Sequence, residues 1–473
     1  MLRIEGKNKK RLWAAGLILA VLACYAFLLL RVEPMAFDAG RYYMFAMGLR
    51  DESGVFSLAN FSAGLRGISY ALWLYAIDGA AGLLRVDPRY AALTVNFLLF
   101  FLCVFVFLRQ FVPQAENDTR RGRVLGGAVG LLVLFTLLAR FSFTTVLTDF
   151  PAFAMCLLGA LLIRGAAVSD GLLRAALRAL VGGACLYTAY NFRTIYLFSV
   201  MVMAVFVLVD AVRQKGRPRS LAVLAAAFLG MLLAALPQMS VNRINYASLS
   251  PLVGLSYSSG GASLFVKQLI WGMDMQKYDT YVNAGVLWSE PTVCFLWKPG
   301  EFLKPLLYQQ TLRGYCSTML KHPLHFIALY ITHFLNMLSP YFTQVYITDL
   351  TVTKWPYLFL MYGICYCVVW DIASKFKTKL YTLRGLLDSK FIPVLAVLIP
   401  GLAIVPGAVE YRFGMPLFWL IFSYFVWGCS WKQRWIDLKA APVGRCLGFL
   451  AGLAAMICFW VQVLASGPVP LGM

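Results

Sequence analysis

The chain has 473 residues, of which 61% are hydrophobic and only 13% charged, and its formal net charge is +21. Because soluble globular domains have an apolar share of about 45–50%, this composition excludes a soluble globular protein and indicates a polytopic membrane protein. The excess Lys and Arg lies in short loops between apolar runs, as the positive-inside rule describes. No soluble segment carries a basic stripe with interleaved aromatic residues, so we expect no nucleic-acid partner.

The N-terminus combines basic residues with an apolar run. Four basic residues lie between Lys7 and Arg11, and the run continues from Trp13 to Leu30. No small-residue cleavage site follows it, so the pattern favours an uncleaved first span over a signal peptide. We therefore expect the N-terminus to lie in the cytosol.

Apolar windows of about 17–25 residues recur along the chain and predict an all-α polytopic membrane protein with about eleven transmembrane helices. The short basic loops between the windows orient them. The predicted spans are residues 13–31, 90–109, 125–141, 150–166, 177–191, 194–211, 220–237, 356–374, 391–409, 413–430 and 446–465.

Two long segments are predicted on the outer side. The first outer loop, 32–89, contains an apolar stretch, 56–84, that Arg66 and Asp78 interrupt, which suits interfacial helices better than a span. The second segment is a large periplasmic region whose apolar run 324–338 we also interpret as an interfacial helix, since crossing there would export the five basic residues between Lys375 and Lys390. The predicted organisation is an N-terminal transmembrane module 1–237, the periplasmic region 238–354 and a C-terminal transmembrane module 355–473.

This topology brings charged residues to one side of the membrane. Asp38, Asp149, Arg193 and Arg412 all lie at or near predicted span ends on the outer side. Any one of them alone fits a solvated collar or an interfacial side chain, whose cost is small. Four on one side predict a shared cavity that opens toward the outer leaflet. Glu33, in the same first loop as Asp38, is expected to be a solvated charge of little consequence.

Several short motifs along the chain resemble those of a known family. A carboxylate followed by Tyr42 and Tyr43 comes just after the first span, and Asp149-Phe150-Pro151 and Glu410-Tyr411-Arg412-Phe413-Gly414-Met415-Pro416 open later spans. Lys321-His322-Pro323 precedes an apolar helix at the end of the large outer region. This order resembles the GT-C superfamily of integral-membrane glycosyltransferases, which use polyprenyl-phosphate-linked sugars. The chain lacks the acidic neighbour of Asp38 that marks the protein mannosyltransferases.

The resemblance implies roles for these residues. Sugar transfer needs a base within hydrogen-bond reach of the acceptor and cations on the departing phosphate, for which Arg is suited. Asp38 would be the catalytic base, and Arg412 and Arg193 would bind the donor phosphate. The supporting or substrate-contacting residues would be Asp149, Glu410, Tyr42, Tyr43 and Tyr411.

The resemblance also implies partners and a location. The donor would be a polyprenyl-phosphate sugar, the acceptor a glycan, lipid or protein, and the surroundings membrane lipids. The expected location is the bacterial inner membrane, with a multi-pass chain and an active site facing the periplasm.

Other residue groups give weaker predictions. Cys294 and Cys316 are the only cysteines in the outer regions, where paired thiols tend to form a disulfide. His322, His325 and His333 share a helix face, which leaves a divalent metal open as cofactor, although no carboxylate stands at ligand spacing. No motif for an organic cofactor is present. Aromatic residues in 271–308 could stack on sugar rings or rest among lipid headgroups.

Two other functions are compatible with a polytopic chain. A lipid-linked sugar flippase or other transporter would need ionisable residues near span midpoints, and internal repeats would favour it, whereas here the charges lie at span ends and no repeat is evident. A structural scaffold of an envelope complex would need no clustered outer charges.

Overall fold

The computed structural model describes residues 2–111, 118–169, 171–213, 218–254, 264–274, 277–283, 286–292, 311–339, 345–347, 355–376, 392–407, 409–429, 448 and 450–454. Helices form most of this part of the chain. In the N-terminal half they are α1 (Leu2–Leu29), α2 (Phe37–Met47), α3 (Ile68–Leu84), α4 (Pro88–Phe111), α5 (Asp118–Leu138), α6 (Phe141–Thr144), α7 (Asp149–Ala167), α8 (Leu172–Phe192), α9 (Leu197–Arg213) and α10 (Pro218–Tyr246).

The second half continues the helical pattern with shorter elements. Its α-helices are α11 (Leu264–Asp274), α13 (Leu312–Lys321), α14 (Pro323–Met337), α15 (Trp355–Phe376), α17 (Ile392–Ala403) and α18 (Met415–Ser423). Short helical turns are η1 (Leu58–Asn60), η2 (Thr194–Tyr196), η5 (Tyr411–Gly414) and the π-helical η6 (Tyr424–Gly428). Proline stands in the first turn of several helices, for example Pro88 in α4, Pro323 in α14 and Pro416 in α18, where its missing N–H costs nothing.

A small three-stranded sheet accompanies the helices. Strand β1 (Lys277–Asn283) pairs antiparallel with β2 (Val286–Thr292) and parallel with β3 (Tyr346–Ile347), in the order β2-β1-β3. These strands were not predicted from the sequence, although β1 carries the aromatic and β-branched residues that strands favour.

The class of helical multi-pass membrane protein is confirmed, but the count of eleven spans is not. Among the described residues, six helices are long and apolar enough to cross a membrane: Arg11–Leu29, Pro88–Gln110, Asp149–Ala167, Leu172–Phe192, Arg219–Tyr246 and Pro356–Ala373. The predicted spans 125–141, 194–211 and 391–409 correspond to shorter apolar helices. Most of the predicted span 446–465 lies outside the described residues.

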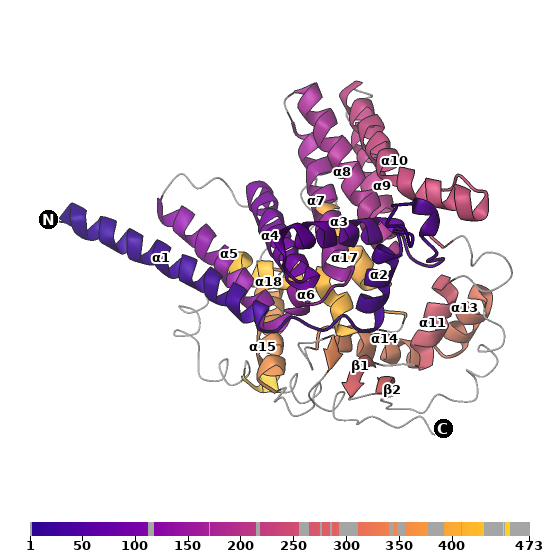
Figure 1. The fold of residues 1–473 in the computed structure, drawn as a ribbon. Coiled ribbons are helices and arrows are strands. Elements are labelled where there is room, and N and C mark those ends of the chain that lie inside the picture. Colours follow the sequence, from indigo (N-terminus) through magenta and orange to yellow (C-terminus); the bar gives the residue numbers. More distant parts are fainter. Residues whose placement is uncertain are drawn as a thin grey trace.

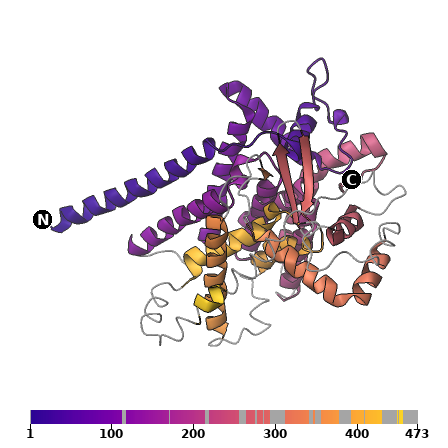
Figure 2. The ribbon, with the colours of Figure 1, turned by 90° about the horizontal axis from the view of Figure 1, so that it is seen from below.

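Helices α7, α8, α9 and α10 pack side by side, whereas α1 extends away from the bundle in both views (Figures 1 and 2). Close approach of α8 to α10 depends on glycine, since a Cβ on Gly183 would collide with the carbonyl of Ala227 and one on Gly230 with that of Leu180. Small residues that bring backbones together are typical of helix contacts in membranes. Helix α10 also continues past the predicted span end at 237, with Pro237 inside it.

An aromatic core joins four helices. Trp419 of α18 is fully buried, and its ring centroid lies 5.7 Å from Phe100 of α4, 5.7 Å from Phe135 of α5 and 5.5 Å from Phe153 of α7. We call these four residues the aromatic core. Because α7 begins at Asp149 and Arg412 precedes α18, this packing fixes the two segments that carry charge at the end of the bundle.

Candidate functional site

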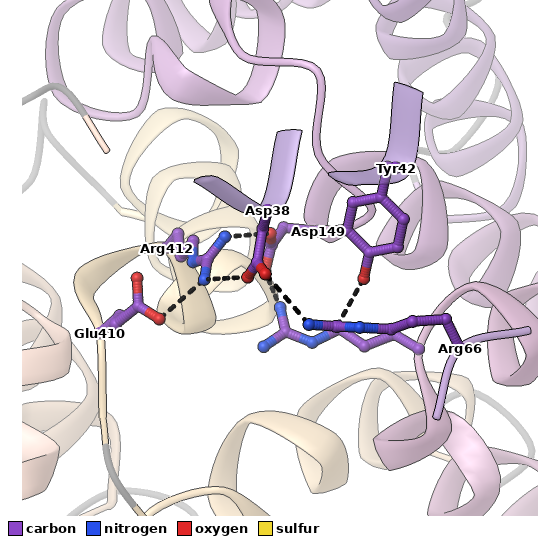
Figure 3. Close-up of polar contacts among 7 residues, drawn as sticks. Asp38, Tyr42, Arg66, Asp149, Glu410 and Arg412 are labelled. Carbon is purple, nitrogen blue, oxygen red and sulfur yellow. Dashed lines mark hydrogen bonds and ion pairs between the residues drawn. The ribbon is translucent and has the colours of Figure 1, made fainter. Parts of the chain in front are cut away.

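Charged side chains from separate parts of the sequence meet at one end of the helix bundle (Figure 3). The ion pairs that connect them run from the first loop to the start of α18. We call this group the charge cluster; it consists of Asp38, Arg66, Asp149, Arg193, Glu410 and Arg412. It contains three carboxylates and three guanidinium groups, so its charges balance.

Arg412 stands at the centre of the charge cluster. Its Nη2 lies 2.7 Å from Glu410 Oε1 and 3.3 Å from Asp38 Oδ2, and its Nη1 lies 3.7 Å from Asp149 Oδ2. Only 10% of the Arg412 side chain is exposed. One guanidinium therefore contacts three carboxylates, as its planar fork of donors allows.

Asp38 lies in the first turn of α2, where the helix dipole favours a negative charge. Its Oδ1 lies 3.1 Å from Arg66 Nη2, so its carboxylate bridges Arg66 and Arg412. Its side chain is 26% exposed, more than that of Asp149 at 3% or Glu410 at 12%. Phe37, immediately before it, has a φ of 47°, which is strained for a bulky residue and is the kind of outlier that gathers at functional sites.

Asp149 and Arg193 join two helix ends. Asp149 lies in the first turn of α7, and Arg193 caps the C-terminus of α8 in an extended conformation. Nη1 of Arg193 forms an ion pair with Oδ1 of Asp149, and its guanidinium lies 4.1 Å from the ring centroid of Phe413. Burial and the neighbouring Arg412 lower the pKa of Arg193 to about 10, so the group stays charged at neutral pH.

The three predicted tyrosines have different contacts. The hydroxyl of Tyr42 accepts a hydrogen bond of 2.6 Å from Nη1 of Arg66, so this tyrosine belongs to the site. Tyr43 instead donates to Asp78 at 2.7 Å, and burial together with this carboxylate raises the pKa of Tyr43 to about 12. Tyr411 donates to the carbonyl of Leu138, which anchors η5 to the end of α5.

Two carboxylates of the charge cluster, Asp38 and Glu410, have opposite pKa shifts. Burial alone would raise the pKa of Asp38, but the charges of Arg412 and Arg66 outweigh it, and the pKa lies below its usual value. Burial raises the pKa of Glu410 and dominates over the opposing charge of Arg412. Asp38 is therefore held as a carboxylate by the same arginines that an incoming anion would need.

The structure changes the interpretation of two residues, Arg66 and Glu33. From the sequence, Arg66 was treated only as an interruption of an apolar stretch, yet it contacts Asp38 and Tyr42; its position in the same outer loop as Asp38 was the available signal. Glu33 was expected to be solvated, but it is 3% exposed. Its N–H donates to the carbonyl of Thr144 at 2.9 Å, and the Thr144 hydroxyl donates to its carboxylate at 3.5 Å, so it is wrong to regard it as an indifferent loop charge.

The remaining predicted features lie partly outside the described residues. Cys316 is a free thiol in the structure, and Cys294 lies outside the described part of the chain, so their disulfide stays a prediction. Most of the aromatic segment 271–308 is outside it too. In the part that is described, which includes all three histidines, no group of three or more His, Cys, Asp or Glu residues has the arrangement of a metal site. The divalent metal stays an untested prediction.

No family model, curated protein or solved structure is significantly similar to this chain. The geometry of the charge cluster is therefore the basis for any functional conclusion.

Proposed function

We propose that this protein is a membrane glycosyltransferase of the GT-C type, which moves a sugar from a polyprenyl-phosphate-linked donor to an extracytoplasmic glycan, lipid or protein. The observation that carries the proposal is the position of Arg412, whose guanidinium is mostly buried and contacts Asp38, Asp149 and Glu410 together. A cation in such a setting, beside a more exposed carboxylate, supplies both elements that the transfer needs: an anchor for phosphate and a base.

The donor phosphate would bind to the arginines of the cluster. Arg412 and Arg193 are held about Asp149, and Arg66 lies on the other side of Asp38 with 41% of its side chain exposed. Guanidinium groups bind phosphate oxygens through paired, charge-assisted hydrogen bonds. Since each of these arginines already pairs with a carboxylate, a phosphate must compete for them. We expect the phosphate to displace Asp38 from the arginines most easily, because Asp38 is the most exposed of the three carboxylates.

Release of Asp38 from its arginines would prepare it for proton transfer. While Arg412 and Arg66 hold it, its pKa is depressed and it is a weak base. Once a phosphate takes up those cations, the carboxylate becomes more basic, which favours general-base catalysis near neutral pH. Donor binding would then precede activation of the acceptor.

The reaction balances with these groups. The acceptor hydroxyl oxygen attacks the anomeric carbon of the sugar and forms the new glycosidic bond while its proton passes to Asp38. The bond between that carbon and the phosphate oxygen breaks, and the electron pair leaves with polyprenyl phosphate. The arginines stabilise the charge that develops on this leaving group. Glu410 and Asp149 hold Arg412 and Arg193 in place and take no proton in this scheme.

The proposal includes a location. Many apolar helices in this chain are consistent with a multi-pass membrane protein, and the charge cluster would face the periplasm of a bacterial inner membrane, at the ends of about eleven spans. The exposed apolar side chains of α14, among them Leu324, Ile327 and Ile331, suit an interfacial helix beside the site.

A transfer assay tests the proposal. Purified protein in lipid nanodiscs would receive radiolabelled polyprenyl-phosphate sugars together with candidate acceptors, and release of water-soluble or acceptor-bound label would be counted. We expect the wild type to transfer sugar and Asp38→Asn to transfer almost none. In sealed vesicles, movement of intact lipid-linked sugar across the bilayer with no cleavage would instead identify a flippase and overturn the proposal.

A further inference from the structure

Buried amide side chains of α8 and α10 form a hydrogen-bonded chain next to the start of α3. Asn191 near the end of α8 donates through Nδ2 to Oε1 of Gln238 at 3.0 Å, and Gln238 donates through Nε2 to Oδ1 of Asn242 at 3.0 Å, both on α10. Asn242 in turn donates through Nδ2 to the carbonyls of Ser250 and Leu252 at 2.7 and 2.8 Å. The three amides are at most 3% exposed. We call Asn191, Gln238 and Asn242 the amide chain.

The amide chain also caps the start of α3. The first N–H groups of a helix have no partner within it, and α3 has no side-chain cap of its own. Here Ile68 donates its N–H to Oε1 of Gln238 at 3.1 Å, and Ser69 donates to Oδ1 of Asn191 at 2.7 Å. Two orphan donors of α3 are thus satisfied by side chains from α8 and α10, which ties three helices together.

Backbone groups fix the direction of the chain at both ends. Carbonyls of Ser250 and Leu252 only accept, so the amide nitrogen of Asn242 must face them and its oxygen must face Gln238. The oxygen of Gln238 must then face Asn191, and the N–H of Ser69 requires the oxygen of Asn191. No amide can be reversed without leaving two donors or two acceptors opposed, so the network has one arrangement.

Glycine lets this network come close to the cluster. Gly67 precedes Ile68, and a Cβ there would collide with both the backbone oxygen and Oδ1 of Asn191. Arg66 is the residue before Gly67, and Arg193 is two residues after Asn191. The same contact therefore fixes the backbone beneath Arg66, which pairs with Asp38, and beneath Arg193, which pairs with Asp149.

We infer that Asn191 and Gln238 are positioning residues, which hold Arg66 and Arg193 at the spacing that the donor phosphate requires. They do not touch the phosphate themselves; they act through the two arginines whose backbone they fix. This inference rests on the proposed function, in that it takes the arginines to bind phosphate. The amide chain suits this positioning role because its hydrogen bonds have one arrangement, and a binding site must be held by groups whose own positions are fixed.

Two matched glycine variants on and near α3 test the inference. The readout is equilibrium binding of radiolabelled polyprenyl phosphate to protein in nanodiscs, which requires no knowledge of the sugar or the acceptor. Gly67→Ala should weaken binding about tenfold or more, as loss of one charged hydrogen bond does. Gly79→Ala is the control, since a Cβ at Gly79 meets no atom within 4 Å, and its binding should match the wild type.

A double-mutant cycle separates positioning from general damage. If Gly67→Ala acts through Arg66 and Arg193, it should have little further effect on binding in an Arg66→Ala/Arg193→Ala background. An equal loss in that background and in the wild type would overturn the inference, because the glycine would then act independently of both arginines.

Gln238→Glu gives a second test, which remains informative if Gly67→Ala does not fold. A protonated carboxyl can still accept from Ile68 and Asn191 and donate to Asn242, whereas a carboxylate cannot donate. Binding by this variant, relative to the wild type at the same pH, should therefore be close to normal at low pH and fall as pH rises. A pH profile that matches the wild type would contradict the inference.

Failure of the inference and failure of the proposed function have different signatures. If Arg412→Ala binds polyprenyl phosphate as the wild type does, the proposed function fails. If Arg412→Ala loses binding while Gly67→Ala and Gln238→Glu retain it at every pH, only the positioning role is wrong.

Discussion

The aromatic core and the charge cluster are built on the same segments but obey different physics. Asp149 begins α7, and Phe153 of the aromatic core lies four residues later; Arg412 precedes α18, and Trp419 lies seven residues later. In the core, Trp419 and its neighbours are completely or almost completely buried and interact through ring edges and faces. Since only four and seven residues of sequence separate the members of each pair, the segments that pack the core also carry the charge cluster.

Under the proposed function the cluster differs, because a phosphate would replace carboxylates as the partner of its arginines. Rings of the core have no competitor for their contacts, whereas the arginines of the cluster would gain as much from a phosphate as from a carboxylate. Exposure follows the same division, since Asp38 and Arg66 remain accessible at 26% and 41% of their side chains. We therefore expect substitutions in the core to affect stability and substitutions in the cluster to affect activity.

The largest expected effect is that of Asp38→Asn on transfer. The variant keeps the size of the side chain but removes the proton acceptor, and loss of a positioned base costs about 100- to 10,000-fold in rate. The thermal unfolding temperature should fall only modestly, because Asp38 is partly exposed and Arg412 keeps Glu410 and Asp149 as partners. The control is Asp51→Asn, which changes an exposed carboxylate that accepts hydrogen bonds from Ser53 and Val55 of its own turn and should transfer normally. Turnover above about a tenth of the wild type in Asp38→Asn would move the base elsewhere.

The next effect is that of Trp419→Ala on stability. Removing a fully buried tryptophan should lower the free energy of unfolding by about 3–5 kcal/mol, while the folded fraction keeps its transfer rate. Unfolding in detergent, followed with the rate per folded molecule, measures both quantities. Trp370→Ala is the control, since Trp370 is 44% exposed on α15 and its loss should be mild. A stable but inactive Trp419→Ala protein would break the division between the two regions.

Arg412→Lys should have an intermediate effect on donor binding. Lysine keeps the charge but cannot reach Asp38, Asp149 and Glu410 with one planar group, and each lost charged hydrogen bond costs about 1.5–3 kcal/mol. We expect the KM for the donor to rise about 10- to 100-fold. Arg89→Lys, which changes a partly exposed local pair with Asp87, should leave KM unchanged. An unaltered KM in Arg412→Lys would argue against a bidentate phosphate contact.

The smallest effect concerns pH. The pKa of Asp38 is depressed because Arg412 and Arg66 outweigh burial, so Asp38 stays ionised in the free protein down to below its ordinary pKa of about 3.9. The stability that these pairs contribute is accordingly present above that pH and lost as pH falls through the folded value. Arg66→Gln removes one cation, so the acid limb of kcat/KM should move to higher pH. The pH profile of the variant, compared with the wild type, checks the direction; a shift to lower pH would contradict it.

Sequence reasoning found much of the cluster because topology constrains charges at span ends. Asp38, Asp149, Arg193 and Arg412 were expected to share one side of the membrane, and the structure brings them into direct contact. It missed Arg66, because an arginine inside an apolar stretch is equally typical of an interfacial helix. The prediction for Glu33 was wrong. Glu33 is buried against Thr144, which lies far away in the sequence, and such a contact cannot be predicted from the loop alone.

Features that arise from tertiary contacts alone were not predictable. The amide chain joins Asn191, expected only as a span end, to Gln238, which was expected just beyond one. The extension of α10 to Tyr246 past Pro237 contradicts the usual preference of proline for helix ends. The span count differs because the predicted spans 125–141, 194–211, 391–409 and 413–430 correspond to shorter helices, of which α18 has nine residues. For such stretches hydropathy alone does not distinguish a crossing from a buried helix.

The central claim is that Asp38 and the donor phosphate compete for the same arginines. Equilibrium binding of polyprenyl phosphate to wild-type protein, Asp38→Asn and Arg412→Ala in nanodiscs at pH 7 tests it most directly. The account predicts that Asp38→Asn binds at least as tightly as the wild type, because a competing carboxylate is gone, and that Arg412→Ala binds more weakly. Weaker binding by Asp38→Asn, or unchanged binding by Arg412→Ala, would contradict it.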